Sequence, residues 1–201
     1  MCKSNLLLGM LLVSFSFFSQ TEDETTKNKI KFGFNFGLNY ATLSDFGFKK
    51  SLDIENGFGF RLGIISEIEM SKKWFLSPKA ELSFNKSVLF ENNVGYRVMP
   101  QNLNFMFHFK HIINEFDNLN PYIYFGPNIW LPIEKENNLL TYQIKPTFGL
   151  DFGFGTDIEL KHYKIAPELR FSVGLNEIRK NPTEKLLLGS NAALIVNFSS
   201  K

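Results

Sequence analysis

The sequence predicts an all-β fold, an eight-stranded antiparallel up-and-down transmembrane β-barrel. Three observations support this prediction: apolar and polar residues alternate with a period of two, eight separate segments do so, and the joins between them are alternately short and long. The composition agrees, because 23 Phe and an aromatic share of 15% coexist with a mean hydropathy near zero. Large apolar side chains must therefore be interleaved with polar ones.

The N-terminal segment is expected to be a signal peptide. The apolar stretch 6–18 follows Lys3 and precedes a polar run, and it is shorter than the roughly 20 residues that a membrane-spanning helix needs. We predict a signal peptide over 1–19, a short periplasmic linker over 20–29 and the barrel domain over 30–201. Cleavage is expected near Ser19 or Gln20, although the bulky Phe17 fits the small-residue rule poorly. A buried N-terminal helix is the alternative.

Charge and cysteine content narrow the class of protein. The formal net charge of +2 gives no strong attraction to nucleic acid, so no nucleic-acid partner is expected. Cys2 is the only cysteine, and the mature chain would have none. A small extracellular module held by disulfides is therefore disfavoured.

The first four predicted strands show the alternation clearly. Segment 30–40 places Ile, Phe, Leu and Tyr side chains on one face and Lys, Gly and Asn on the other. Segments 58–70 and 74–84 alternate apolar with charged residues and are separated by the short turn 71–73. Segment 102–110 follows Pro100 and presents one Leu and three Phe on the same face. Each segment is long enough for the roughly 9 to 11 tilted residues that cross a bilayer.

The last four predicted strands complete an even number. Segment 121–131 carries aromatic residues on both faces, and we assign its outward face to Ile123, Phe125, Ile129 and Leu131. Segment 142–160 is the longest, and its interior proline and glycines do not suit a helix. Segments 165–175 and 186–198 follow. Joins 71–73 and 161–164 are short, joins 41–57, 86–95, 132–141 and 176–185 are longer and polar, and the partly apolar join 111–120 is an exception.

The direction of the apolar face separates a membrane barrel from a soluble lipocalin-like barrel that binds a hydrophobic ligand, because both kinds alternate. Ten of the 14 glycines fall on the polar face. An eight-stranded barrel has little interior room, so glycines and a few charged residues fit inside, whereas the many phenylalanines do not. We therefore expect the phenylalanines to contact lipid, and we expect the protein in an outer membrane.

The polar face supplies the candidate site residues. We predict a charge network in the lumen formed by Arg61, Glu67, Glu69, Lys79, Glu81, Lys145, Asp151, Asp157, Glu159, Glu168 and Arg170. Such a network would conduct ions or, in so narrow a barrel, act as a structural plug, which we favour. Tyr40, Trp74, Tyr142 and Phe198 are predicted to form interfacial aromatic girdles.

No motif predicts catalysis, a cofactor or a metal site. The two-residue spacing of the carboxylates is what any inward strand face produces. His108, His111 and His162 lack the spacing of metal ligands, and His108 is interpreted as a polar lumen residue. The glycine-rich run 149–155 lacks the helix that a phosphate loop needs. An outer-membrane lipid hydrolase with a Ser-His-acid set is the enzymatic alternative, but no Ser can be placed beside a His from the sequence.

Several short motifs resemble a known family. Residues 34–40 (FNFGLNY), Pro100, residues 120–127 (NPYIYFGP) and residues 165–171 (IAPELRF) are similar to the PorT-like outer-membrane β-barrel family of Bacteroidetes. The resemblance covers nearly the whole mature chain. It implies an outer-membrane location and, for the founding branch, a part in type IX protein secretion and gliding. A barrel packed with side chains cannot pass a folded protein, so the implied role is an accessory, an anchor or a binding scaffold for secretion-machinery proteins.

Overall fold

The computed structural model describes residues 30–46, 53–91, 94–114, 116, 118–133, 145–178 and 186–200. The expected signal peptide (1–19) and linker (20–29) lie outside the described residues. No helix that is long and apolar enough to cross a membrane occurs in the described part of the chain.

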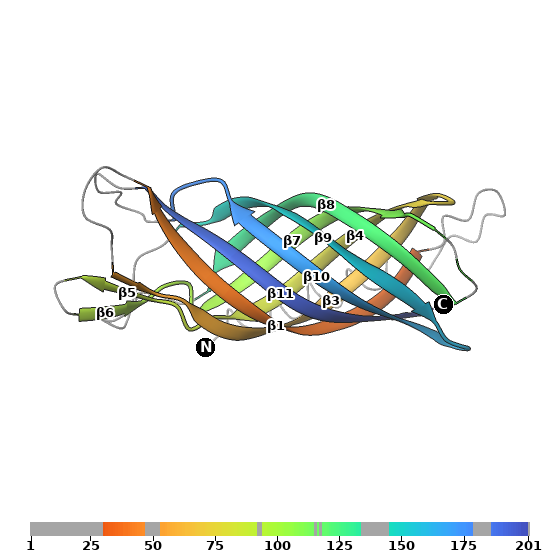
Figure 1. Ribbon diagram of the computed structural model, residues 1–201, viewed down its shortest axis with the longest axis horizontal. Helices are drawn as coiled ribbons and strands as arrows, with labels where there is room; N and C mark the ends of the chain where they lie inside the picture. Colours follow the sequence, from red (N-terminus) through yellow and green to blue (C-terminus); the bar gives the residue numbers. More distant parts are fainter. Residues whose placement is uncertain are drawn as a thin grey trace, which may run out of the picture.

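Eight antiparallel strands close into a barrel, which confirms the predicted fold class (Figure 1). Around the barrel they follow the order β1, β11, β10, β9, β8, β7, β4, β3. The closing strand β1 pairs on one side with β11 and on the other with β3, so Phe34 lies opposite both Phe198 and Ile64. The strand bounds are β1 (Ile30–Phe46), β3 (Gly57–Ser71), β4 (Trp74–Phe84), β7 (Gln101–Ile112), β8 (Leu119–Pro132), β9 (Thr147–Glu159), β10 (Tyr163–Gly174) and β11 (Leu186–Ser200).

The apolar face of the strands points outward. Phe32 is 60% exposed and Phe152 is 51% exposed, whereas Asn35 and Asn39 on the opposite face of β1 are buried. The ambiguous strand β8 follows the assignment made from the sequence, since Ile123 and Phe125 are exposed. A lipocalin-like barrel would have the opposite arrangement, so that alternative is wrong. Closure also pairs the backbone groups of every barrel strand, as lipid requires.

The joins predicted as loops contain additional strands, which is a correction. β1 continues to Phe46, and a separate three-stranded sheet is formed by β2 (Asp53–Glu55), β5 (Val88–Glu91) and β6 (Val94–Arg97). Figure 1 shows β5 and β6 projecting beyond one end of the barrel, which we call the mouth end, while the C-terminus lies at the other. The turns 72–73 and 160–162 lie at that other end, which we call the turn end. The sixth strand was predicted to start at residue 142, whereas β9 begins at Thr147.

Two inward tyrosines of β8 lie over glycines of the neighbouring strand β9. Tyr122 is paired in register with Gly155, and Tyr124 with Gly153. A Cβ added at Gly155 would lie 2.6 Å from the Tyr122 hydroxyl oxygen, and one at Gly153 would lie 2.5 Å from that of Tyr124. The backbone carbonyl oxygens of Leu169 and Pro167 on β10 are equally close or closer, so the phenol rings and the neighbouring backbone together require glycine at both positions.

The lipid-facing position of Phe152 can be tested with Phe152→Arg. Phe152 is in the middle of β9, so we expect a loss of about 2–4 kcal/mol in the free energy of unfolding in vesicles, as for an arginine at the bilayer midplane. The matched control is Tyr163→Arg, at the first residue of β10 and close to the membrane edge, which should cost only about 0–1 kcal/mol. Urea unfolding of the reconstituted protein measures both. Equal costs at the two positions would contradict the assignment of the membrane span.

Candidate functional site in the barrel lumen

A chain of five charged side chains fills the middle of the lumen. Glu81 accepts hydrogen bonds from Arg170 at 2.9 and 3.0 Å and from Arg61 at 3.3 Å. Arg170 also bonds Glu168, which in turn accepts from Lys79 Nζ at 2.9 and 3.0 Å. All five are at most 7% exposed. Positive and negative groups therefore alternate along the chain.

This chain braces opposite walls of the barrel. Glu81 and Lys79 belong to β4, whereas Arg170 and Glu168 belong to β10, four positions away in the ring of eight strands. The ion pairs between them thus cross the full width of the lumen. Neutral groups complete the coordination: Asn35 donates to Glu81 at 2.7 Å, and Arg61 donates to Asn191 Oδ1 at 2.9 Å.

A second cluster of four charges lies nearer the turn end. Lys110 Nζ donates to Glu67 at 2.7 Å and to both oxygens of Asp157 at 2.8 Å. Lys164 Nζ contacts Glu67 and donates to Asp157 at 3.1 Å. Each lysine therefore bridges the same two carboxylates. Lys110 also lies 4.1 Å from the centre of the Tyr122 ring, a cation–π contact.

Between the mouth cluster and the turn end, the buried charges balance. They comprise five cations, Arg61, Lys79, Lys110, Lys164 and Arg170, and five carboxylates, Glu67, Glu81, Asp151, Asp157 and Glu168. A sixth buried carboxylate, Glu177, lies at the mouth end, where it accepts a hydrogen bond from the Leu187 N–H at 2.6 Å. Taking an ion out of water is costly unless an opposite charge and hydrogen bonds replace the water. Nine of the ten groups form ion pairs with one another, and Asp151 is held by His108 and Asn128.

A histidine and a serine lie beside the central chain. His108 Nε2 is 2.9 Å from Asp151 Oδ2, and Ser77 lies directly opposite His108 in the register of β4 and β7. His108 Nδ1 has no hydrogen-bond partner among the described residues. The adjoining cavity is about 10 Å³, room for at most one water molecule. The residue types of a Ser-His-Asp set therefore adjoin, beside a cavity that has room for at most one water molecule.

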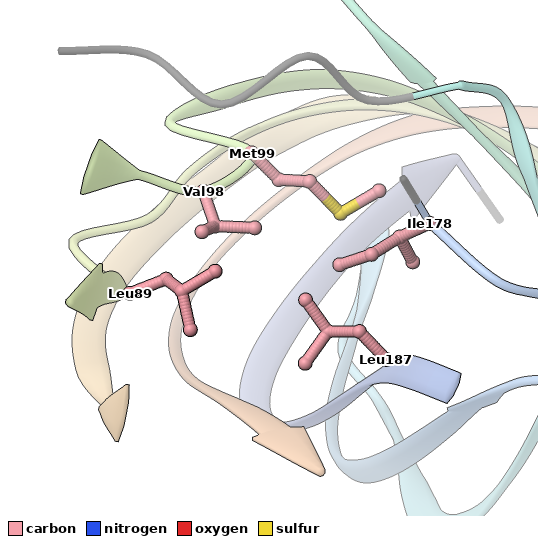
Figure 2. Packing of buried hydrophobic residues seen from close by; sticks show 5 residues of the cluster. All are labelled: Leu89, Val98, Met99, Ile178 and Leu187. Atoms are coloured by element: carbon pink, nitrogen blue, oxygen red, sulfur yellow. The ribbon is translucent and has the colours of Figure 1, made fainter. Parts of the chain in front are cut away.

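An apolar cluster closes the mouth end of the lumen. Figure 2 shows its five buried members converging from two sides: Leu89, Val98, Met99, Ile178 and Leu187. We call these the mouth cluster. A cavity of about 30 Å³ lies below it, bordered by Arg61, by several asparagines and serines and by apolar side chains that include Trp130. That volume holds only one or two water molecules.

Met99 carries the one positive φ among the non-glycine residues that the structure describes, at 51°. Its carbonyl oxygen accepts hydrogen bonds from the side-chain amides of Asn85 at 3.1 Å and Asn102 at 3.0 Å. These two bonds hold the strained residue in place under the base of the β5–β6 hairpin. Such strain persists only where the surroundings determine the conformation.

The turn end of the lumen is open and polar. A vestibule of about 430 Å³ is lined there by Lys31, Lys72, Asp157, Glu159 and Lys164, with an apolar wall that includes Phe75. Its inner limit is the lysine–carboxylate cluster. The two ends of the lumen thus differ, because the mouth is capped by apolar residues and the turn end is lined by charges.

The predicted network residues fall into two groups. The structure brings eight together in the lumen: Arg61, Glu67, Lys79, Glu81, Asp151, Asp157, Glu168 and Arg170. Glu69 is half-buried and makes no ion pair with another described residue. Lys145 precedes β9 and is likewise outside the network, whereas Glu159 lines the vestibule.

Two network members were missed by sequence reasoning. Lys110 lies on the inward face that the alternation of β7 already indicated, so the parity of the strand could have found it. Lys164 was assigned to a turn, but β10 begins at Tyr163 and Lys164 is its first inward residue. Lys164 was missed because the start of this strand was predicted too late in the sequence.

The aromatic residues predicted to form interfacial girdles differ from one another in exposure and in the side chains that they contact. Tyr40 is exposed and packs on Phe58 with ring centroids 4.8 Å apart, and Trp74 at the turn end is exposed and tilted against His111 at 4.4 Å. Phe198 is half-buried and stacks on Phe34 at 5.0 Å. Tyr142 lies outside the described residues.

No group of three or more potential metal ligands occurs among the residues with described positions.

Comparisons with known proteins agree with this architecture. A family model described as an outer membrane protein beta-barrel domain matches residues 18–180. The crystal structure of the outer membrane protein OprG from Pseudomonas aeruginosa is similar, with a TM-score of 0.56 and 11% identity over 85% of this chain and 94% of that chain.

Two further solved structures are similar at lower scores. The solid-state NMR structure of outer membrane protein AlkL has a TM-score of 0.48 and 10% identity, over 90% of this chain and 96% of that chain. The crystal structure of Ail, the attachment invasion locus protein of Yersinia pestis, has a TM-score of 0.43 and 11% identity, over 84% of this chain and 97% of that chain. No curated protein matches the sequence.

The importance of the central chain can be tested with Glu81→Gln. This change leaves Arg61 and Arg170 without the carboxylate that both contact, and breaking a buried ion pair in this way costs about 3–5 kcal/mol. The control is Glu69→Gln, which breaks no ion pair among the described residues and should stay within about 0.5 kcal/mol. Equilibrium urea unfolding in vesicles gives both values. A loss below about 1 kcal/mol for Glu81→Gln would show that the network is dispensable.

Proposed function

Because this chain belongs to the family of outer membrane protein beta-barrel domains, we propose that it is a non-enzymatic anchor and binding scaffold. The protein is located in the outer membrane, where its eight-stranded barrel spans the bilayer. Barrels of this kind place short turns in the periplasm and longer joins outside the cell. The turn end is accordingly the periplasmic end, and the mouth end is extracellular.

The observation that carries the proposal is the filled lumen. Paired charges cross the barrel between opposite strands, and two cavities among the described residues above the turn-end vestibule measure only about 10 and 30 Å³. A protein whose interior is braced in this way acts through its surfaces and not through a pore. The predicted plug role of the charge network is part of this proposal.

The sheet formed by β2, β5 and β6 supplies a binding surface at the mouth end. Its base is attached to the barrel, since Ser87 Oγ donates to the Ala41 carbonyl of β1 at 3.2 Å, and the Val98 N–H closes the hairpin by donating to the Ser87 carbonyl at 3.0 Å. Leu89 of β5 is completely buried in the mouth cluster. A sheet held this firmly presents a fixed surface to a partner, which lowers the entropic cost of binding.

We propose secretion-machinery proteins as the partners, in an accessory role in type IX secretion. The support is the resemblance of residues 34–40, 120–127 and 165–171 to the PorT-like barrels of Bacteroidetes. The family that matches the chain is broader than that branch. A braced lumen is consistent with an accessory and inconsistent with passage of a folded cargo protein.

A filled lumen predicts an electrically silent protein. Reconstituted into a planar bilayer, the full chain should give no stepwise conductance, because the ion pairs of β4 and β10 obstruct the path. A porin reconstituted in the same way provides the positive control. Regular conductance steps from well-folded protein would contradict the plug.

The accessory role predicts a secretion phenotype. A deletion strain should lose secreted cargo while the mass spectrum of its lipid A is unchanged. Complementation with the wild-type gene should restore cargo secretion. Normal secretion in the deletion strain would contradict the secretion role and would leave the anchor role to be judged by the conductance experiment.

A lipid-modifying hydrolase is the second candidate, and one observation favours it. Ser77 lies opposite His108, which is bonded to Asp151, so the residue types of a catalytic triad adjoin. The cavity beside them is too small for an ester or an acyl chain. Ser77→Ala should therefore complement the deletion strain fully. Failure of a folded Ser77→Ala protein to complement, with altered lipid A, would favour the enzyme.

A further inference from the structure

A shallow apolar groove crosses the outer face of the barrel over β1, β3, β4 and β7. It has a volume of about 410 Å³. The strand registers explain its shape, because Ser66 on β3 and Pro78 and Ala80 on β4 lie among the larger side chains Phe32, Ile64 and Phe107. Phe32 pairs with Ser66, Ile64 with Ala80, and Pro78 with Phe107.

The walls of the groove are among the exposed residues of the barrel. Phe32 is 60% exposed, Ile64 63% and Phe107 50%, whereas Ser66, Pro78 and Ala80 between them are half-buried. The groove lies on the face that contacts lipid. An unfilled groove would forfeit dispersion contacts along its lining, so an acyl chain lying in it is favoured.

A pair of lysines lies at the turn end of the same strands. Following β4 from Pro78 back to its first residue leads to Trp74 and then to the turn formed by Lys72 and Lys73. At the usual rise of a strand, Lys73 is roughly 16 Å along the chain from Pro78, a distance that one acyl chain can span. Both lysines are exposed, and neither makes an ion pair with another described residue. Lys72 also borders the vestibule.

Trp74 marks the level of the membrane interface between the groove and the lysines. It is 42% exposed and tilted against His111. Tryptophan at the edge of a barrel prefers the headgroup level of the bilayer. The three features are therefore in the order of a phospholipid: an apolar groove, an interfacial aromatic and a cationic turn.

We propose that this groove and the Lys72–Lys73 turn bind an anionic phospholipid of the periplasmic leaflet. One acyl chain lies between Phe32 and Phe107 over Ser66, Pro78 and Ala80. The phosphate lies at the two lysines, whose attraction to an anionic lipid is selective over a zwitterionic one.

Brominated lipids test the proposal through the fluorescence of Trp74. The full chain carrying Trp130→Phe, which leaves Trp74 as the only tryptophan, is reconstituted in phosphatidylcholine vesicles that contain a small fraction of brominated phosphatidylglycerol. The reference vesicles contain brominated phosphatidylcholine at the same fraction. Phosphatidylglycerol should quench Trp74 more strongly, with a preference of about fivefold in local binding for each lysine.

Three variants locate the site. Lys72→Ala with Lys73→Ala should abolish the preference, and Ala80→Leu should weaken it by filling the groove. Lys161→Ala, in the β9–β10 turn at the same end of the barrel, is the matched control and should keep it. Native mass spectrometry of the wild-type protein in detergent, which needs no variant, should detect one retained phosphatidylglycerol in preference to phosphatidylcholine.

Several results would overturn the proposal. They are equal quenching by the two lipids, a preference that survives removal of both lysines, a preference unaffected by Ala80→Leu, and an equal loss in the Lys161→Ala control. Heat-dependent gel mobility of each variant establishes that it is folded before its quenching is compared. The outcome is independent of the secretion phenotype and of the conductance experiment.

Discussion

Charge neutrality inside a narrow interior is the constraint on which this barrel depends. An eight-stranded barrel has little space for the water that would solvate ten ionised groups, so each group must find a charged or polar partner among the inward side chains. The structure meets this requirement with bonds between strands that are distant in the ring, such as those from Lys79 of β4 to Glu168 of β10. The inside of the barrel is consequently as specific in its pairing as a well-packed apolar core.

The outside obeys a different requirement, because lipid accepts almost any apolar side chain. Its large residues can therefore vary in size without breaking the fold, and the small ones on β3 and β4 leave a groove. The two ends differ as well. Apolar residues cap the mouth, where a firmly held sheet projects, whereas lysines and carboxylates line the vestibule at the turn end. Binding functions are thus expected at the ends and on the outer wall, and the interior holds these surfaces in position.

The sequence was sufficient for the eight strands and for the direction in which their faces point, because the period-2 pattern and the narrow interior leave one arrangement. It was insufficient where the pattern is short or interrupted. The β5–β6 hairpin has four residues in each strand and was interpreted as a loop, although two asparagines between two short apolar runs are a hairpin signal. The ion pairs could not be predicted from the sequence either. The alternation of strand faces places Glu81 and Arg170 inside the barrel, but the tilt and closure of the strands decide that these two side chains meet. The same holds for Ser77 and His108, which adjoin through register alone.

The two phenol rings that cover glycines of β9 have a consequence for how the protein assembles. Sliding β8 by two residues along β9 would bring Tyr122 over Gly153 but would move Tyr124 onto Asp151, where a side chain already occupies the space. A slip by one residue would turn the tyrosines toward lipid and the neighbouring Ile123 and Phe125 inward. The native register of β8 on β9 is thus the one that places both phenol rings over glycines.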